Sequence, residues 1–147
     1  MINIYYKFDK RVNVSNQGAL TLFYLRRLRG VIIMCQVIED FKISLIEDGK
    51  SPKTIESYVG NIKAFIEFLG SKGVEFNGTL QRFYVVSYKN FLVENNYEVA
   101  TINKKKNSIH ELNRYLVATG AMKEIAVENS KDRIKIVYGS EKQVEVY

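Results

Sequence analysis

Apolar side chains recur at intervals of three and four residues in four separate stretches of the chain, a pattern typical of helices that bury one face. These stretches run from Met34 to Glu47, from Pro52 to Gly70, from Leu80 to Glu94 and from Thr101 to Thr119. The links between them are short, and one proline in 147 residues leaves helices largely uninterrupted. The pattern therefore predicts an all-α fold, a compact bundle of four helices.

Local signals mark where these helices start and stop. Ser51 followed by Pro52 is the strongest start, because serine caps a helix and proline suits its first position. Thr79 and Thr101 are the expected caps of the third and fourth helices. Gly49 stands directly after the first helix, where a glycine often ends one.

Both ends of the chain lack this pattern, which suggests a division into three parts. Residues 1–33 are expected to form an irregular basic extension, residues 34–130 the helical domain, and residues 131–147 a linker. Ile134, Ile136 and Tyr138 alternate with polar residues, so a short β-hairpin fits the last segment as well as an extended linker does.

Most of the net charge of +6 lies outside the predicted bundle. Residues 1–33 hold six basic residues and one acidic residue, which gives +5. Residues 34–147 hold sixteen basic and fifteen acidic residues, which gives +1. Overall basicity therefore does not establish that the bundle binds nucleic acid, and local surfaces must carry that argument.

The second helix has a polar face without acidic residues. Lys53, Ser57, Gly60, Asn61 and Ala64 share one side at spacings of three and four. The lysine, hydroxyl and amide groups can donate hydrogen bonds, and the small residues would let a phosphate backbone approach closely. The start of this helix adds free N–H groups and a positive dipole end, which also favour phosphate.

The fourth helix has a second such face, opposite its apolar stripe, made of Asn103, Lys104, Asn107, His110 and Arg114. Three consecutive lysines in its first two turns oppose the helix dipole, and an anionic partner would reverse that cost. Lysine suits phosphates, and the asparagine amide suits base edges in the major groove. A solvated face is the simpler interpretation of the lysines, and both interpretations stand at this point.

Side chains for catalysis or metal binding are scarce. The chain has one histidine, His110, and one cysteine, Cys35, which excludes an internal disulfide and any zinc site built on cysteines of one chain. No glycine-rich phosphate loop is present. The apolar stretch from Ala19 to Cys35 contains three arginines, so it is not expected to cross a membrane. The sequence therefore predicts no cofactor, no metal and no membrane partner.

The order of the motifs resembles the core-binding domain of tyrosine recombinases and phage integrases over roughly residues 35–130. That family shows Ser-x-x-Thr with a tyrosine four residues on, as in Ser51-Pro-Lys-Thr54 and Tyr58. Its last helix begins Thr-Ile-Asn-Arg-Lys-Leu-Ser-x-Leu, which is similar to the segment from Thr101 to Ile109. Two positions depart from the family: Lys106 replaces a leucine, and Glu128-Asn-Ser replaces a closing Asn-Pro.

The resemblance implies a four-helix, SAM-like bundle that grips a recombination site together with a catalytic domain, its second and fourth helices approaching double-stranded DNA. This chain is then expected to be a non-catalytic part of a recombinase for DNA integration or excision, cytoplasmic and nucleoid-associated, with other recombinase protomers as partners of the full-length protein. The helix faces and the resemblance together give the candidate DNA-contacting residues: Lys53, Thr54, Ser57, Asn61, Thr101, Asn103, Lys104, Lys105 and Asn107.

Other interpretations stay open beside this one. A helical protein–protein interaction module would need an exposed apolar stripe beyond those that close the bundle. A stand-alone enzyme would need a cluster of titratable residues that the sequence lacks. The catalytic half of a recombinase, with its nucleophilic tyrosine and arginine–histidine set, is expected to follow Tyr147. Residues 1–33 fit either a small arm-binding domain or an extension ahead of a start at Met34.

Overall fold

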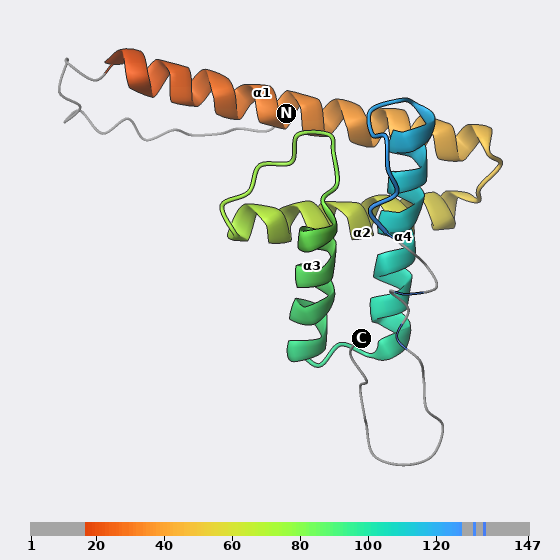
Figure 1. The fold of residues 1–147 in the computed structure, drawn as a ribbon. Helices are drawn as coiled ribbons and strands as arrows, with labels where there is room; N and C mark the ends of the chain where they lie inside the picture. Colours follow the sequence, from red (N-terminus) through yellow and green to blue (C-terminus); the bar gives the residue numbers. More distant parts are fainter. Residues whose placement is uncertain (1–16, 128–130, 132–133, 135–147) are drawn as a thin grey trace.

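Four helices form the fold in the computed structural model, which describes residues 17–127, 131 and 134 (Figure 1). They are α1 (Gln17–Glu47), α2 (Pro52–Ser71), α3 (Arg82–Glu94) and α4 (Val99–Ala118). In Figure 1, α1 and α2 lie one above the other, and α3 and α4 run across them. The described residues contain no strand, so the all-α prediction is confirmed. The C-terminal segment, for which a short hairpin and an extended linker both stayed open, falls almost wholly outside them.

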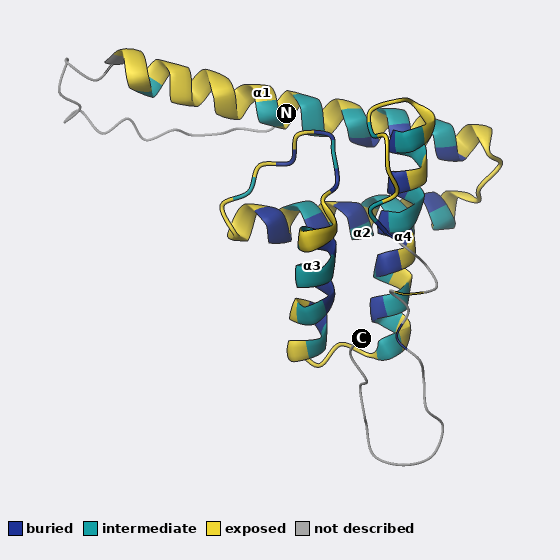
Figure 2. Cartoon of the chain, viewed as in Figure 1, coloured by how far each residue is buried: buried dark blue, intermediate teal, exposed yellow. Residues whose placement is uncertain are grey.

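The core lies where the four helices meet, and the segment after α4 completes it (Figure 2). Ile62 and Leu112 are fully buried, and Phe65 is 1% exposed, as the apolar stripes of α2 and α4 predict. Val127 and Ile134, which follow α4, are buried in the same cluster. The bundle therefore includes residues beyond its last helix.

The end of α1 and the start of α2 lie at the residues that the sequence predicts, Gly49 and Ser51. The backbone N–H of Thr54 donates to Ser51 Oγ at 3.3 Å, so Ser51 caps α2, with Pro52 in the first turn. Gly49 closes α1 with a φ of +71°, a backbone conformation that costs glycine little.

The starts of α3 and α4 differ from the prediction. Their N-cap residues are Gln81 and Glu98, and neither makes a side-chain cap hydrogen bond. Thr79 belongs instead to a turn, in which Asn77 Oδ1 accepts from its backbone N–H at 3.1 Å and its hydroxyl at 2.7 Å. Thr101 lies within the first turn of α4, because that helix begins two residues earlier at Val99.

The first half of α1 corrects the expectation of an irregular extension for residues 17–33, whereas residues 1–16 lie outside the described part of the chain. The helix starts at Gln17 and runs without a break past Met34 (Figure 1). Leucines and arginines favour a helix here, but apolar side chains occur on all sides of it, so no one-sided pattern marks it in the sequence. Gly30 lies beside the Glu75 side chain, because a Cβ atom at this position would be 3.5 Å from Glu75 Oε2. No helix in the described part of the chain has the length and apolar character to cross a membrane.

Candidate nucleic-acid interface

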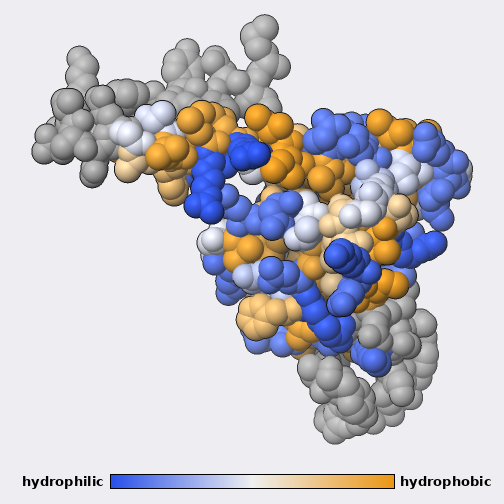
Figure 3. Space-filling view, turned by 45° about the horizontal axis from the view of Figure 1, so that its top comes forward, coloured by the Kyte–Doolittle hydropathy of each residue, from blue (hydrophilic) through white to orange (hydrophobic). Residues whose placement is uncertain are grey.

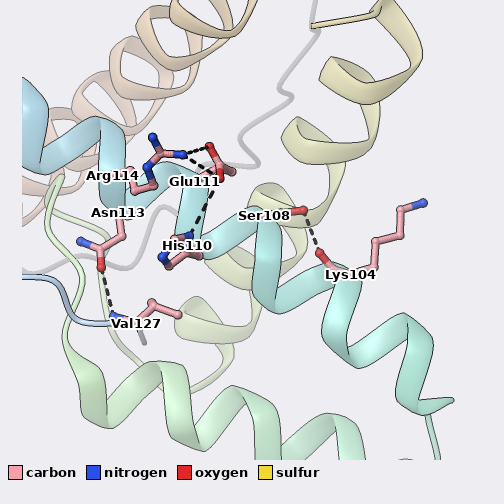
Figure 4. A network of polar contacts seen from close by, with 7 residues as sticks. All are labelled: Lys104, Ser108, His110, Glu111, Asn113, Arg114 and Val127. Atoms are coloured by element: carbon pink, nitrogen blue, oxygen red, sulfur yellow. Dashed lines mark hydrogen bonds and ion pairs between the residues drawn. The ribbon is translucent and has the colours of Figure 1, made fainter. Parts of the chain in front are cut away.

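Polar side chains of α2 and α4 meet where the two helices pack against each other, and of the two predicted faces only that of α2 contributes a side chain, Asn61. Asn61 Nδ2 donates to Ser108 Oγ at 2.9 Å, and Lys105 Nζ donates to Asn61 Oδ1 at 3.5 Å. Ser108 is fully buried, and its hydroxyl donates in turn to the backbone oxygen of Lys104 at 3.1 Å (Figure 4). Candidate residues from both helices thus form one continuous polar contact.

The start of α2 places its candidates at the surface. Lys53 is exposed, and Thr54 and Ser57 are half-buried. The hydroxyls of Ser51 and Thr54 lie 2.9 Å apart, within hydrogen-bond distance. Because the Thr54 hydroxyl is paired inside the protein, Lys53 is the more accessible donor at this end of the helix.

The three consecutive lysines of α4 have different surroundings. Lys104 is exposed, Lys105 is half-buried beside Asn61, and Lys106 is only 5% exposed. Lys106 stands where the resembled family has a leucine, and its aliphatic stem can fill such a position. The sequence alone suggests three equivalent cations, whereas Lys104 and Lys105 are the two at the surface. Thr101 is half-buried and Asn107 is exposed on the same helix.

Asn103 is a candidate whose amide is bound to the protein itself. Its Nδ2 donates to the backbone oxygen of Ile134 at 3.0 Å, and its Oδ1 accepts from the Ile134 N–H at 3.1 Å. Both hydrogen-bonding groups of the amide thus hold the segment that follows α4. A polar residue beside the buried Ile102 gives no sign of this partner, because the contact joins residues 31 positions apart.

Asn113 holds the backbone in the same way further along α4, and sequence reasoning missed it. It is fully buried, and its Oδ1 accepts from the N–H groups of Ala126 at 2.7 Å and Val127 at 3.0 Å (Figure 4). An asparagine next to Leu112 in an inward-facing series was the signal that could have identified it, because a buried amide requires partners.

The other polar side chains of α4 form a small ion-pair cluster. Arg114 Nη1 lies 3.2 and 3.3 Å from the two carboxylate oxygens of Glu111, and His110 Nδ1 lies 3.9 Å from Glu111 Oε1 (Figure 4). Arg114, expected on the cationic face, is therefore neutralised by an acidic neighbour. The described residues contain no group of acidic, histidine and cysteine side chains that could hold a metal ion.

The described chain matches a known family over the part that forms the bundle. The family model "Phage integrase, N-terminal SAM-like domain" matches residues 38–120, which is more than half of the chain. The match begins at Ile38, the first buried residue of α1, and ends at Gly120, just after α4. No curated protein and no solved structure matches the chain significantly.

Proposed function

Because the chain belongs to the phage integrase N-terminal SAM-like domain family, we propose that it is a DNA-binding domain of a site-specific tyrosine recombinase. It grips double-stranded DNA at a recombination site during integration or excision, and a separate catalytic domain breaks and joins the strands. The observation that carries this proposal is the contact between α2 and α4, in which Lys105 of α4 lies 3.5 Å from Asn61 of α2, so that one candidate from each helix lies at the same place.

Lysines supply the affinity of this surface, because an ammonium group is a point charge that suits any phosphate. Lys104 and Lys53 are exposed, and Lys105 lies between α4 and α2. The proposed DNA-contacting residues are Lys53, Thr54, Ser57, Asn61, Thr101, Asn103, Lys104, Lys105 and Asn107.

Two of these residues, Asn61 and Asn103, already form hydrogen bonds within the protein. Asn61 bridges Lys105 and Ser108, and Asn103 binds the backbone of Ile134. A contact that uses both groups of the amide on an adenine edge would require either asparagine to turn away from that partner. In the DNA-free protein both asparagines position their neighbours, Asn61 the lysine and Asn103 the segment after α4.

The proposal is tested by the salt dependence of DNA binding. Replacing Lys53, Lys104 or Lys105 by alanine should weaken binding to all duplexes alike and lower the slope of log K against log salt by about 0.9 for each phosphate that is no longer neutralised. Lys123→Ala removes an exposed lysine beyond α4 and should leave the slope unchanged. Fluorescence anisotropy from low to moderate salt measures this, and equal slopes for all four variants would contradict the assignment.

A protein–protein interaction module is the second candidate, and one observation favours it. The first half of α1 exposes large apolar residues, including Leu22 at 70% and Ile32 at 66%. The two functions are compatible in one chain, because this helix half lies away from the contact between α2 and α4 (Figure 1). A chain that binds no DNA at any salt concentration would leave only the function of a protein–protein interaction module.

A further inference from the structure

Exposed apolar residues lie along α1, in stretches separated by hydrophilic residues (Figure 3), and several of them share one side of the helix. Leu25, Leu28 and Ile32 follow the three-and-four spacing of a helix face, and Ile43 and Ile46 continue it. Their exposed fractions are 57, 56, 66, 51 and 57%. We call these five residues the outer stripe.

Most of the outer stripe points away from the rest of the bundle, and Ile43 at its edge borders a hollow that Tyr115 and Ala118 of α4 also line. The buried residues of α1 are Ile38, Phe41 and Leu45, which by helical periodicity lie on the opposite side. The stripe is extended by Leu22, which is separated from Ile46 at the other end by about 36 Å along the helix axis. The stripe has two apolar parts, Leu22 to Ile32 and Ile43 to Ile46, with the exposed polar residues Gln36 and Glu39 between them. A monomer rarely exposes so many large apolar side chains on one helix face.

Charge divides α1 into two unlike halves. Arg26, Arg27 and Arg29 lie in the first half, and residues 17–38 contain no acidic side chain. The second half carries Glu39, Asp40 and Glu47 with a single lysine, Lys42. A helix that is basic at one end and acidic at the other is complementary in charge to a second copy of itself that runs antiparallel to it.

We propose that a second copy of this chain covers the outer stripe, with the two α1 helices packed antiparallel about a two-fold axis close to Met34. In this register Leu25 comes level with Ile43 of the second copy, and Leu22 comes level with its Ile46. Arg29 then comes level with Glu39 of the second copy. The two-fold axis repeats every pair, as a closed homodimer requires.

The charges select this arrangement over two others. A parallel pair would set the arginines of one copy against the same arginines of the other, which repels. An anionic membrane surface would attract the first half, but Glu39 lies within the outer stripe between Ile32 and Ile43, and Asp40 and Glu47 follow it. A membrane-bound helix instead collects cations on its polar face and keeps its apolar face free of charge.

Sedimentation of the full chain without DNA tests the dimer. The wild-type chain should sediment as a dimer at micromolar concentration. Ile32→Asp should raise the dimer dissociation constant about 100-fold or more, since each dimer loses two buried isoleucines and gains two carboxylates. Phe83→Asp is the matched control, because Phe83 is 73% exposed on α3 and lies outside the stripe. It should leave the dimer intact.

Two further variants test the antiparallel register. Arg29→Glu should weaken association about 5-fold or more, and the double variant Arg29→Glu with Glu39→Arg should restore it. Cys35 is exposed and lies next to the proposed two-fold axis, so mild oxidation should link two copies through it. Ile32→Asp should abolish that cross-link at the same protein concentration.

A chain that stays monomeric at high concentration overturns the proposal. So does a dimer that Ile32→Asp leaves unchanged, or a monomer that cosediments with phosphatidylserine vesicles. The DNA-binding function is judged separately, because Ile32→Asp leaves Lys53, Lys104 and Lys105 in place and should bind DNA with an unchanged salt slope.

Discussion

Asn113 shows how one buried amide can hold a loop. Its Oδ1 accepts from two successive backbone N–H groups, those of Ala126 and Val127, and its Nδ2 lies 3.7 Å from Met122 Sδ. These backbone groups belong to no helix, so the side chain provides the hydrogen bonds that secondary structure would otherwise supply. A buried polar group is tolerated here because it is paired.

Asn113→Ala should therefore lower the free energy of unfolding by about 2–4 kcal/mol, because two backbone donors near the core lose their acceptor. Asn107→Ala is the matched control, an exposed asparagine on the same helix, and should change stability by less than about 0.5 kcal/mol. Urea denaturation followed by circular dichroism measures both. Similar decreases in stability for the two variants would show that the Asn113 hydrogen bonds add little.

Tyr88 makes stability depend on alkaline pH. Its ring lies 5.2 Å from that of Phe65 and 5.1 Å from that of Phe68, and burial, then Tyr97 and Glu67, raises its pKa to about 12. The ordinary value is about 10. The folded state thus favours the neutral phenol, so this contribution is complete below pH 10 and is lost as the pH rises toward 12.

Tyr88→Phe should make the free energy of unfolding fall less steeply between pH 10 and 12 than it does in the wild-type chain. Urea titrations at pH 9 and pH 11 give the comparison. Burial, then Asp40, also raises the pKa of Tyr115, so part of the slope should persist in the variant. Identical slopes in both proteins would mean that Tyr88 titrates normally when folded.

At the scale of the element, α2 supplies much of the core. Its buried residues include Ile62, Phe65 and Leu69, and the Phe65 ring packs on Tyr88 of α3. Phe65→Ala should cost about 3–5 kcal/mol, because it leaves a cavity at a fully packed position. Phe83→Ala, at an exposed site of α3, should cost less than about 1 kcal/mol. Thermal unfolding of both variants gives the comparison, and equal shifts would place Phe65 outside the core.

The sequence predicts a helix start or end correctly where residues next to it in the chain determine it. Ser51 and Gly49 act through neighbouring backbone groups, so the start of α2 and the end of α1 were predictable. The first half of α1 has apolar side chains on every side, and therefore lacks the one-sided pattern that identifies a bundle helix. The pairing of Asn103 with Ile134 depends on how the chain returns after α4, which no short window of sequence contains.

At the scale of the whole molecule, charge and core occupy different parts of the chain. Among the described residues the first buried one is Ile38, so the described helix half before Met34 adds no buried side chain to the core. The same region, together with the residues before it, carries +5 of the net charge of +6. The stability of the bundle and its overall basicity are therefore separable.

At protein concentrations too low for the proposed dimer, deleting residues 1–33 should change the free energy of unfolding by less than about 1 kcal/mol, because the deletion removes no buried side chain among the described residues. DNA binding should keep its dependence on Lys104 and Lys105, at a lower overall affinity. Urea denaturation and anisotropy on the shortened chain test both statements. A shortened chain that no longer binds DNA would locate the DNA contacts in residues 1–33.

The contacts that Val127 and Ile134 make with the bundle determine where a stable fragment of this domain can end. The family match stops at Gly120, yet Val127 and Ile134 are buried, and Asn113 and Asn103 hold the backbone beside them. A fragment trimmed to the matched residues would keep α2, α3 and α4 whole but leave two amides on α4 without their acceptors and donors. An expression fragment ending after Ile134 should resist proteolysis, and one ending at Gly120 should be degraded. The unit that resists a protease should therefore be longer than the unit that sequence similarity delimits.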